Sequence, residues 1–131
     1  MTGDAGDPAG WWDGAVFDRI LADVPCSASG VVARHPDVKW LRRPGDVAGF
    51  AAGQRRILFA LWNTLAPGGK LLYATCSVFP EENQELIETF LRGHPDAEPI
   101  PIALPFMRDG QILPDAERDG FFYCLLDRCH S

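Results

Sequence analysis

Two cysteines stand in matching surroundings and could do chemistry. Cys26 lies in LADVPCSASG, three residues after Asp23, and Cys76 lies in LLYATCS; each follows an apolar run and has small or polar neighbours. A thiolate is a good nucleophile and can form covalent intermediates. A lone cysteine of this kind is most simply a core residue, because free cysteine is among the most buried residue types. The recurrence of the pattern favours a chemical role for the pair.

The apolar runs before the two cysteines predict two strands with a helix between them. Residues 17–23 (FDRILAD) are mostly apolar with turn signals on both sides, which predicts a buried strand, and residues 70–77 (KLLYATCS) predict another. Between them, Asp46 is a suitable N-cap, and residues 67–69 (PGG) are expected to end the helix. The apolar positions at helical spacing are Val47, Phe50, Ala51, Ile57, Leu58, Leu61 and Leu65.

The second half of the chain predicts one more helix and two terminal strands. The helix is expected at 79–92, with acids in its first turn that suit the helix dipole. Its apolar face would consist of Leu86, Ile87, Phe90 and Leu91. The proline-rich passage 95–106 cannot hold a regular helix. Strands are expected within 110–113 and at 120–128.

The order of these elements predicts an α/β fold. Alternating strands and helices imply a parallel sheet with right-handed crossovers, and ligands of such sheets bind beyond the carboxyl ends of the strands. Neighbouring strands lie about 4.8 Å apart. Cys26 and Cys76 are therefore expected at one edge of the sheet, facing a shared cleft.

Composition excludes several classes of protein. The chain has 131 residues, of which 47% are hydrophobic and 23% charged, as in an ordinary globular domain, although it is short for an α/β enzyme. No apolar run reaches the roughly 20 residues of a membrane helix, and no signal peptide is recognisable at the N-terminus, so a cytoplasmic location without membrane contact is expected. No C-x-x-C pair is present and the three histidines stand apart from the cysteines, so no metal is expected.

One basic segment contrasts with the overall net charge of −6, which argues against a free-standing nucleic-acid binder. Residues 33–44 contain four basic side chains, a single acid and a tryptophan. Charge alone favours a solvated loop for this segment.

Four stretches of the chain together resemble the Sun/Fmu (RsmB-type) family of bacterial 16S ribosomal RNA cytosine-5 methyltransferases, which use S-adenosylmethionine. They are DVPCSASG, RHPDVKWLRR, YATCSVFPEEN and DGFFY, in the family's order and with its spacing. The resemblance runs from about residue 3 to residue 126. It implies a Rossmann-like class I methyltransferase fold, with parallel strands and a terminal antiparallel strand.

The resemblance implies a task for each cysteine. C5 of cytosine is a poor nucleophile, and addition of a thiolate to C6 activates it for methylation; elimination then removes the C5 proton and releases the enzyme. The nucleophile of the family's Thr-Cys motif corresponds to Cys76. The cysteine of its Pro-Cys motif, which assists product release, corresponds to Cys26.

The resemblance also implies binding residues. Asp23 and Pro25, in the Asp-x-Pro-Cys motif, and Asp4, in a Gly-Asp pair, correspond to contacts with S-adenosylmethionine. The basic segment would lie beside Cys26, where cationic and aromatic groups suit RNA phosphates and an unstacked base. The expected RNA contacts are Arg34, His35, Lys39, Trp40, Arg42 and Arg43.

The chain departs from the family pattern by what it lacks. The family's glycine-rich cofactor loop, its ribose-binding acid and its N-terminal RNA-binding domain have no counterpart in the sequence. Residues 1–131 are therefore expected to be one partial domain, the C-terminal portion of the catalytic domain. Such a fragment is expected to be inactive, and to expose the edge of the strand at 17–23, which invites self-association.

Other functions make different demands on the cysteines. An amino-group methyltransferase would carry Asp-Pro-Pro-Tyr-like residues in place of the Pro-Cys motif, and a DNA cytosine methyltransferase would leave Cys76 without a task. A cysteine hydrolase would need a histidine near its thiol, and only His35 is a plausible partner. A non-catalytic RNA or protein interaction fragment, or a methyltransferase for cytosine in another RNA, stays open.

Overall fold

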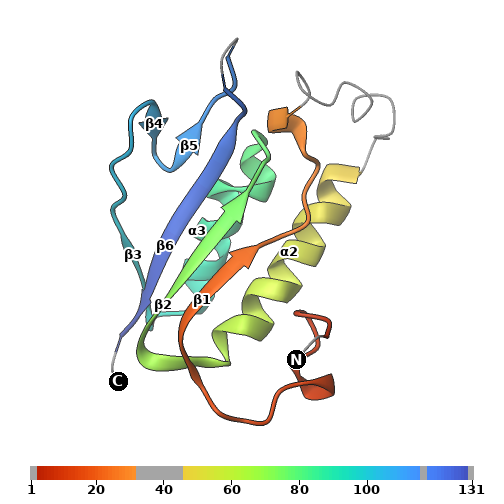
Figure 1. Cartoon of the computed structure of the whole chain (residues 1–131), viewed down its shortest axis with the longest axis vertical. Helices are drawn as coiled ribbons and strands as arrows, with labels where there is room; N and C mark the ends of the chain where they lie inside the picture. The colour runs from red at the N-terminus through yellow and green to blue at the C-terminus, as the bar shows by residue number, and fades with distance from the viewer. Residues whose placement is uncertain (1–2, 32–45, 116–117, 130–131) are drawn as a thin grey trace.

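The computed structural model describes residues 3–31, 46–115 and 118–129, which form a mixed sheet with two α-helices (Figure 1). The strands are β1 (Phe17–Asp23), β2 (Leu65–Thr75), β3 (Ala97–Ile100), β4 (Met107–Arg108), β5 (Gln111–Ile112) and β6 (Phe121–Arg128). The helices are α2 (Asp46–Trp62) and α3 (Gln84–Gly93), with short 3-10 turns η1 (Pro8–Gly10), η2 (Ser29–Val31) and η3 (Pro80–Glu82).

The sheet has the order β1-β2-β6-β5-β4, with β3 also paired to β6. β1 and β2 are parallel, whereas β6 runs antiparallel to β2. The predicted parallel pair, the helix between its strands and the antiparallel terminal strand are thus confirmed. Within the described part of the chain, this arrangement agrees with the mixed α/β sheet that the resemblance implies.

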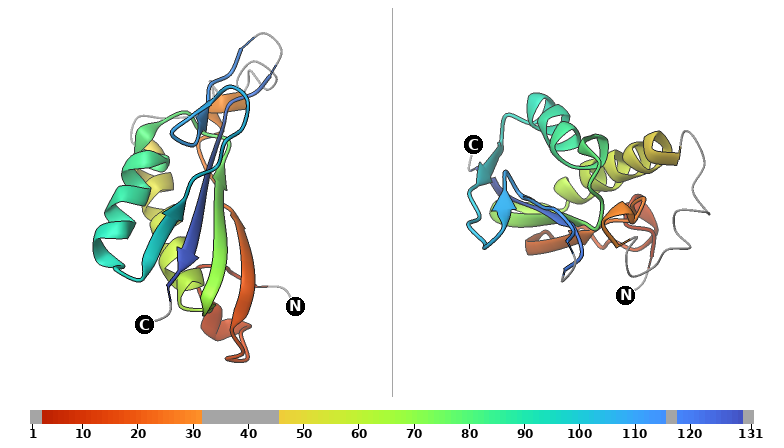
Figure 2. Two further views of the ribbon diagram at one scale, coloured as in Figure 1. Left: turned by 90° about the vertical axis from the view of Figure 1, so that its left-hand side faces the viewer. Right: turned by 90° about the horizontal axis from the view of Figure 1, so that it is seen from above.

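Both helices lie on the same face of the sheet (Figure 2). The core between the layers contains Leu58 and Trp62 of α2, Phe90 of α3, and Tyr73 and Phe122 of the sheet, none of them more than 1% exposed. Alternate residues of β2 and β6 point away from this core, so Lys70 and Asp127 form an ion pair of 3.1 Å on the other face. The helices therefore cover one side of the strands that carry the cysteines.

β1 lies at an open edge of the sheet. It pairs with β2 on one side and, among the described residues, with no strand on the other. Ala22 is buried, but Leu21 is 68% exposed and most of the strand is open to solvent. The expectation of a buried strand at 17–23 was therefore wrong for this chain, whereas the expected exposure of its edge is confirmed.

The helix before β2 ends earlier than the sequence predicts. α2 ends at Trp62, and both the N–H and the hydroxyl of Thr64 donate to the Leu61 carbonyl, at 2.9 and 2.8 Å. The PGG turn lies inside β2 instead, where Gly68 has a φ of 82° and the register with β1 shifts. The glycines therefore serve an irregular strand, because φ values above zero suit glycine in a bulge as well as at a helix end.

The proline-rich passage contains no helix, as predicted, but it does contain β3, which the sequence analysis missed. Pro99 lies in this strand, opposite Leu126 of β6. Proline is tolerated in a strand with a free edge because its missing N–H would otherwise point to solvent. Proline content alone therefore predicted the absence of a helix and not the presence of a strand.

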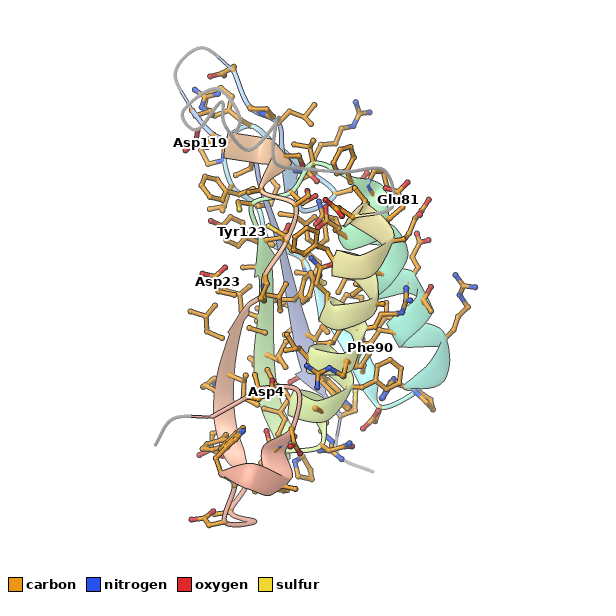
Figure 3. All side chains as sticks on the ribbon, turned by 90° about the vertical axis from the view of Figure 1, so that its right-hand side faces the viewer. Asp4, Asp23, Glu81, Phe90, Asp119 and Tyr123 are labelled. Carbon is orange, nitrogen blue, oxygen red and sulfur yellow. The ribbon has the colours of Figure 1, made fainter. Side chains whose placement is uncertain are left out.

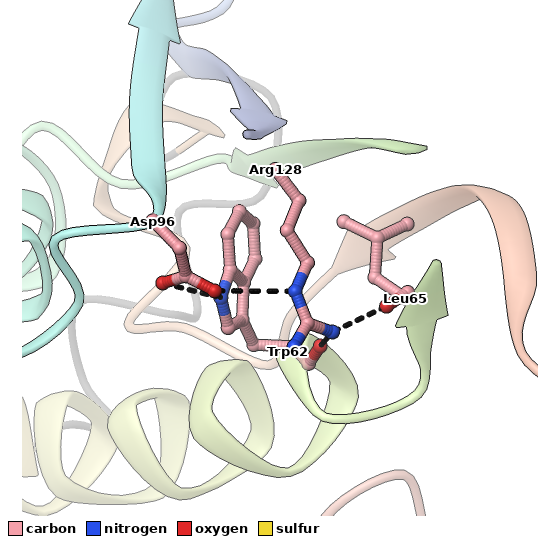
Figure 4. Close-up of polar contacts among 4 residues, drawn as sticks. All are labelled: Trp62, Leu65, Asp96 and Arg128. Carbon is pink, nitrogen blue, oxygen red and sulfur yellow. Dashed lines mark hydrogen bonds and ion pairs between the residues drawn. The ribbon is translucent and has the colours of Figure 1, made fainter. Parts of the chain in front are cut away.

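A polar cluster closes the end of the sheet opposite to the cysteines (Figure 4). Arg128 donates to Asp96 at 3.1 Å, to the Trp62 carbonyl at 3.1 Å and to the Leu65 carbonyl. The Trp62 indole N–H donates to Asp96 at 3.2 Å. These contacts join the end of α2 to β2 and β6, and so fix the helix against the strand that leads to Cys76.

Candidate active site

The two cysteines meet at the carboxyl ends of β1 and β2. Asp23, the last residue of β1, is in register with Ala74, so Cys26 and Cys76 follow the two strands at nearly the same level. Their sulfur atoms lie 3.2 Å apart, and both are free thiols. The juxtaposition predicted from the sequence is confirmed. Cys26 is buried, at 9% exposure, whereas Cys76 is half-buried, so Cys76 is the sulfur that an incoming molecule meets more readily.

The surroundings of Cys76 favour its protonated form. Burial, the hydrogen bond with the Cys26 thiol and the charge of a Cys26 thiolate raise the pKa of Cys76 to about 12, and the Asp23 carboxylate acts in the same direction. A thiol is nucleophilic only after deprotonation. The Cys76 thiol of this chain is therefore mostly protonated at neutral pH.

The raised pKa predicts how Cys76 reacts with an alkylating agent. We expect alkylation of Cys76 by iodoacetamide to rise about tenfold per pH unit between about pH 7 and 10, because the thiolate fraction keeps growing far above the usual cysteine pKa of about 8.5. Peptide mass spectrometry would follow Cys76 separately from the other cysteines. Cys26→Ala removes the neighbour that raises the pKa, so it should speed the reaction at a given pH. A plateau below about pH 9 in the unchanged chain would contradict this prediction.

A buried carboxylate contacts the residues that directly follow the two cysteines. Glu82 of η3 has no solvent exposure. Its Oε1 accepts from the Ser27 N–H at 2.7 Å and from the Gln54 amide at 3.2 Å, and its Oε2 accepts from the hydroxyls of Ser27 (2.7 Å) and Ser77. From the sequence, Glu82 is expected only to be an acid in the first turn of a helix, where it suits the helix dipole. Its place in YATCSVFPEEN, within the motif that contains Cys76, was the available signal.

Asn83 supports the Cys76 side of the site and was also missed. Its Oδ1 accepts from the Thr75 hydroxyl at 2.7 Å, and its Nδ2 donates to the Ser77 carbonyl at 2.9 Å and to Gln111 at 2.7 Å. Thr75 and Ser77 flank Cys76 in the chain. The backbone around Cys76 is thereby fixed from both directions.

Asp23 is the acid nearest to the cysteines in the chain, at the carboxyl end of β1 (Figure 3). Its side chain is exposed, so it is free to accept hydrogen bonds from a polar ligand. The carbonyl of Pro25 accepts from Gln54 at 2.9 Å, which orients the turn that leads to Cys26. A contact of Asp23 or Pro25 with S-adenosylmethionine stays a prediction.

Asp4 lies well below Asp23, toward the amino end of β1 (Figure 3). It accepts from the Gly6 N–H at 2.9 Å, which holds its pKa below the ordinary value, and forms an exposed ion pair with Arg56 at 3.4 Å. The structure therefore does not bring the two predicted cofactor acids together in this chain. A contact of Asp4 with the cofactor stays a prediction.

The predicted RNA contacts lie outside the described residues. These are Arg34, His35, Lys39, Trp40, Arg42 and Arg43. Their segment follows η2 in the chain, close after Cys26, and precedes α2. Among the residues that the structure does describe, no group of three His, Cys, Asp or Glu side chains could hold a metal, and no helix is long and apolar enough to span a membrane.

Comparison with known proteins identifies relatives over nearly the whole chain. The family model described as 16S rRNA methyltransferase RsmB/F matches residues 1–127. The ribosomal RNA small subunit methyltransferase B of Vibrio cholerae is 52% identical over 131 residues, covering 99% of this chain, and that of Salmonella paratyphi B is 54% identical over 125 residues, covering 95%. The chain spans about 30% of the length of these relatives.

A solved structure with the same fold is that of NSun6 from Pyrococcus horikoshii, determined with SFG. It superposes with a TM-score of 0.83 at 25% identity, covering 100% of this chain and 34% of the neighbour. The family match and the shared fold thus cover nearly the same residues of this chain.

Proposed function

The chain belongs to the 16S rRNA methyltransferase RsmB/F family, and from that premise we propose that its complete protein transfers a methyl group from S-adenosylmethionine to C5 of a cytosine in 16S ribosomal RNA. The observation that carries the proposal is the pair of free thiols 3.2 Å apart at the carboxyl ends of two parallel strands. Two thiols in contact suit a reaction in which one sulfur attacks a base and the other acts on the same adduct.

The proposed reaction assigns the attack to Cys76. Its thiolate forms a bond to C6 of cytosine, and the electrons of the C5–C6 double bond are then available at C5. C5 takes the methyl group as the bond between that methyl and the sulfonium sulfur breaks, which releases S-adenosylhomocysteine. Loss of the C5 proton restores that double bond and expels the Cys76 thiolate. The greater exposure of Cys76 supports this assignment, since the base must reach the attacking sulfur.

Cys26 is assigned to the elimination step. It is the more buried of the two thiols, with its sulfur within hydrogen-bond distance of the attacking sulfur. From this position it would assist removal of the C5 proton or departure of Cys76 once the methyl group is in place. General acid–base assistance of this kind contributes on the order of 10²–10⁴ to a rate.

The cofactor and the RNA are assigned to the same end of the sheet. We propose that Asp23 and Pro25 contact S-adenosylmethionine, with Asp4 at the adenine end and the rest of the cofactor site in the part of the protein outside this chain. The neighbour determined with SFG, an S-adenosylmethionine analogue, supports this ligand. Cationic residues of the segment 33–44 would contact the RNA backbone, and the complete protein would act in the cytoplasm.

A cysteine hydrolase receives no support from the described histidine. His94 stacks on Phe90 at 4.0 Å between ring centroids, and its Nδ1 contacts the Phe90 carbonyl at 2.9 Å. The ring thus belongs to an aromatic cluster with Phe59 and Trp62. Neither thiol has a described histidine as its base, whereas methyl transfer to C5 does not require one.

The proposal is tested by comparing the methylated product of the complete protein with that of the isolated chain. We expect the complete protein to yield 5-methylcytidine in 16S ribosomal RNA, as measured by transfer of a labelled methyl group and mass spectrometry of the nucleosides. The isolated 131 residues should give none, because β1 has an open edge among the described residues and the chain spans only about 30% of the length of its relatives.

Several outcomes would contradict this prediction. Methylation at the amino group of the base would contradict methyl transfer to C5. Labelling of another RNA in preference to 16S RNA would contradict the proposed substrate. Turnover by the isolated chain would show that it is not a partial domain. Sedimentation of the isolated chain tests self-association through the β1 edge in the same samples.

A further inference from the structure

Glu82 connects the two cysteines through the residues that directly follow them. Ser27 follows Cys26 and Ser77 follows Cys76, and each donates to the Glu82 carboxylate. The Gln54 side chain of α2 donates to the same carboxylate. A single buried group is thus bonded to both loops that carry sulfur and to the helix packed behind them.

We infer that Glu82 is the positioning residue that sets the separation of the Cys26 and Cys76 sulfur atoms, a role that rests on the proposed function. Glu82 does not touch the reacting base in this account. It acts through the two serines, by holding the loop after β1 and the loop after β2 in one arrangement.

The hydrogen bonding of Glu82 fits such a role. An ionised carboxylate accepts about four hydrogen bonds, and Glu82 has four described donors, three of them on residues next to the cysteines. Burying a carboxylate costs free energy that well-packed apolar side chains would not, and losing its partners costs more. A fully buried glutamate therefore adds little to the stability of the fold, but it can fix the relative positions of the two loops that carry the cysteines.

The carboxylate is itself held in place. The Tyr73 hydroxyl donates to the Glu82 backbone carbonyl at 2.7 Å, and Tyr73 is a fully buried residue of β2. The neighbouring Asn83 is bonded to Thr75 and Ser77. Glu82 is thus fixed to the core of the sheet. The loops that contain Ser27 and Ser77 are therefore held relative to the sheet as well as to each other.

The expected consequence is a loss of rate without a loss of binding. Attack at C6 and release at C5 require both sulfurs to be placed on one base, and misplacement of catalytic groups by about 1 Å can cost about 10²-fold in rate. In Glu82→Gln, the amide NH₂ cannot accept a hydrogen bond, so the serine hydroxyls beside it have to turn and accept from it, and the charge-assisted hydrogen bonds that join the two loops are lost. We expect kcat to fall about 10²-fold, with KM for RNA and for S-adenosylmethionine within about threefold of the unchanged protein.

The rate of disulfide formation with diamide, measured in the complete protein, reports how often the two sulfur atoms meet. Diamide takes up the two thiol hydrogens as Cys26 and Cys76 form a disulfide, and the rate depends on how often the sulfurs meet. We expect Glu82→Gln to form this disulfide at least about tenfold more slowly, relative to the iodoacetamide rate of Cys76 in the same variant. Glu81→Gln is the matched control, since Glu81 is the exposed neighbour in η3 and should leave both rates unchanged.

Ser27→Ala and Ser77→Ala cover the case in which Glu82→Gln fails to fold. Each removes a hydroxyl contact with Glu82 and should lower the disulfide rate in the same direction. The inference is overturned if Glu82→Gln forms the disulfide as fast as Glu81→Gln. If Glu82→Gln does not fold, the inference is overturned when both serine variants form the disulfide as fast as Glu81→Gln. It is equally overturned if kcat falls while the disulfide rate does not. If the unchanged protein methylates no RNA, the proposed function fails, but the disulfide rates still decide the role of Glu82.

Discussion

Replacing Cys76 by alanine in the complete protein is expected to abolish methyl transfer. Without this sulfur no covalent bond to C6 forms, and C5 of cytosine stays a poor nucleophile. Removal of an enzyme's covalent nucleophile costs several orders of magnitude, and we expect a loss of at least about 10³-fold in kcat. Labelled-methyl transfer to 16S RNA measures the loss, and a denaturing gel of enzyme with RNA should show no adduct.

Two controls make the Cys76 result specific. Cys129→Ser changes a cysteine near the end of β6 that contacts Glu98 at 3.4 Å, far along the chain from the proposed site, and should leave turnover unchanged. Binding of RNA to Cys76→Ala should also be kept, because the side chain is small. Residual turnover within about tenfold of the unchanged protein would show that Cys76 is not the nucleophile.

Replacing Cys26 by alanine should have the opposite effect on the adduct. Cys76 can still attack, and the loss of the Cys26 thiol removes a hydrogen bond and a charge that raise the pKa of Cys76. Elimination, however, loses its assistance, so the covalent RNA–protein species should accumulate while turnover falls on the order of 10²–10⁴-fold. The gel shift of the adduct and the yield of 5-methylcytidine are measured on the same samples.

The pair of variants is more informative than either alone. An adduct in Cys26→Ala and none in Cys76→Ala assigns attack to one sulfur and release to the other. The reverse pattern would exchange the two roles, as in the DNA cytosine enzymes, in which the Pro-Cys cysteine attacks. Absence of any adduct in both variants, with turnover retained, would remove covalent catalysis from the account.

The sequence predicted the parts of the fold that depend on local pattern. The apolar runs at 17–23 and 70–77, with a helical periodicity between them, were enough to predict a parallel pair with both cysteines at its carboxyl end. The structure confirms this placement and adds that the two sulfur atoms lie 3.2 Å apart. This succeeded because the carboxyl ends of adjacent parallel strands meet at the same edge of the sheet.

Features set by three-dimensional context were not predictable in the same way. The pattern PGG predicts the end of a helix, yet residues 67–69 form an irregular part of β2. The helix has already ended before them, where Thr64 donates to the Leu61 carbonyl. Glu82 reads as a surface acid in a first turn, and only the assembled fold brings Ser27 and Gln54 to it. Such pairings link residues 28 to 55 positions apart, which no local periodicity encodes.

The attacking sulfur can be identified directly with RNA that carries 5-fluorocytosine at the target position. Fluorine replaces the C5 proton that must leave, so attack and methylation proceed but elimination stops, and the enzyme stays bonded to C6. Mass spectrometry of the digested complex then shows which peptide carries the nucleotide. We expect a methylated nucleotide on the peptide that contains Cys76. A nucleotide on the peptide that contains Cys26, or methylation without any protein adduct, would contradict the assignment of Cys76 as the nucleophile.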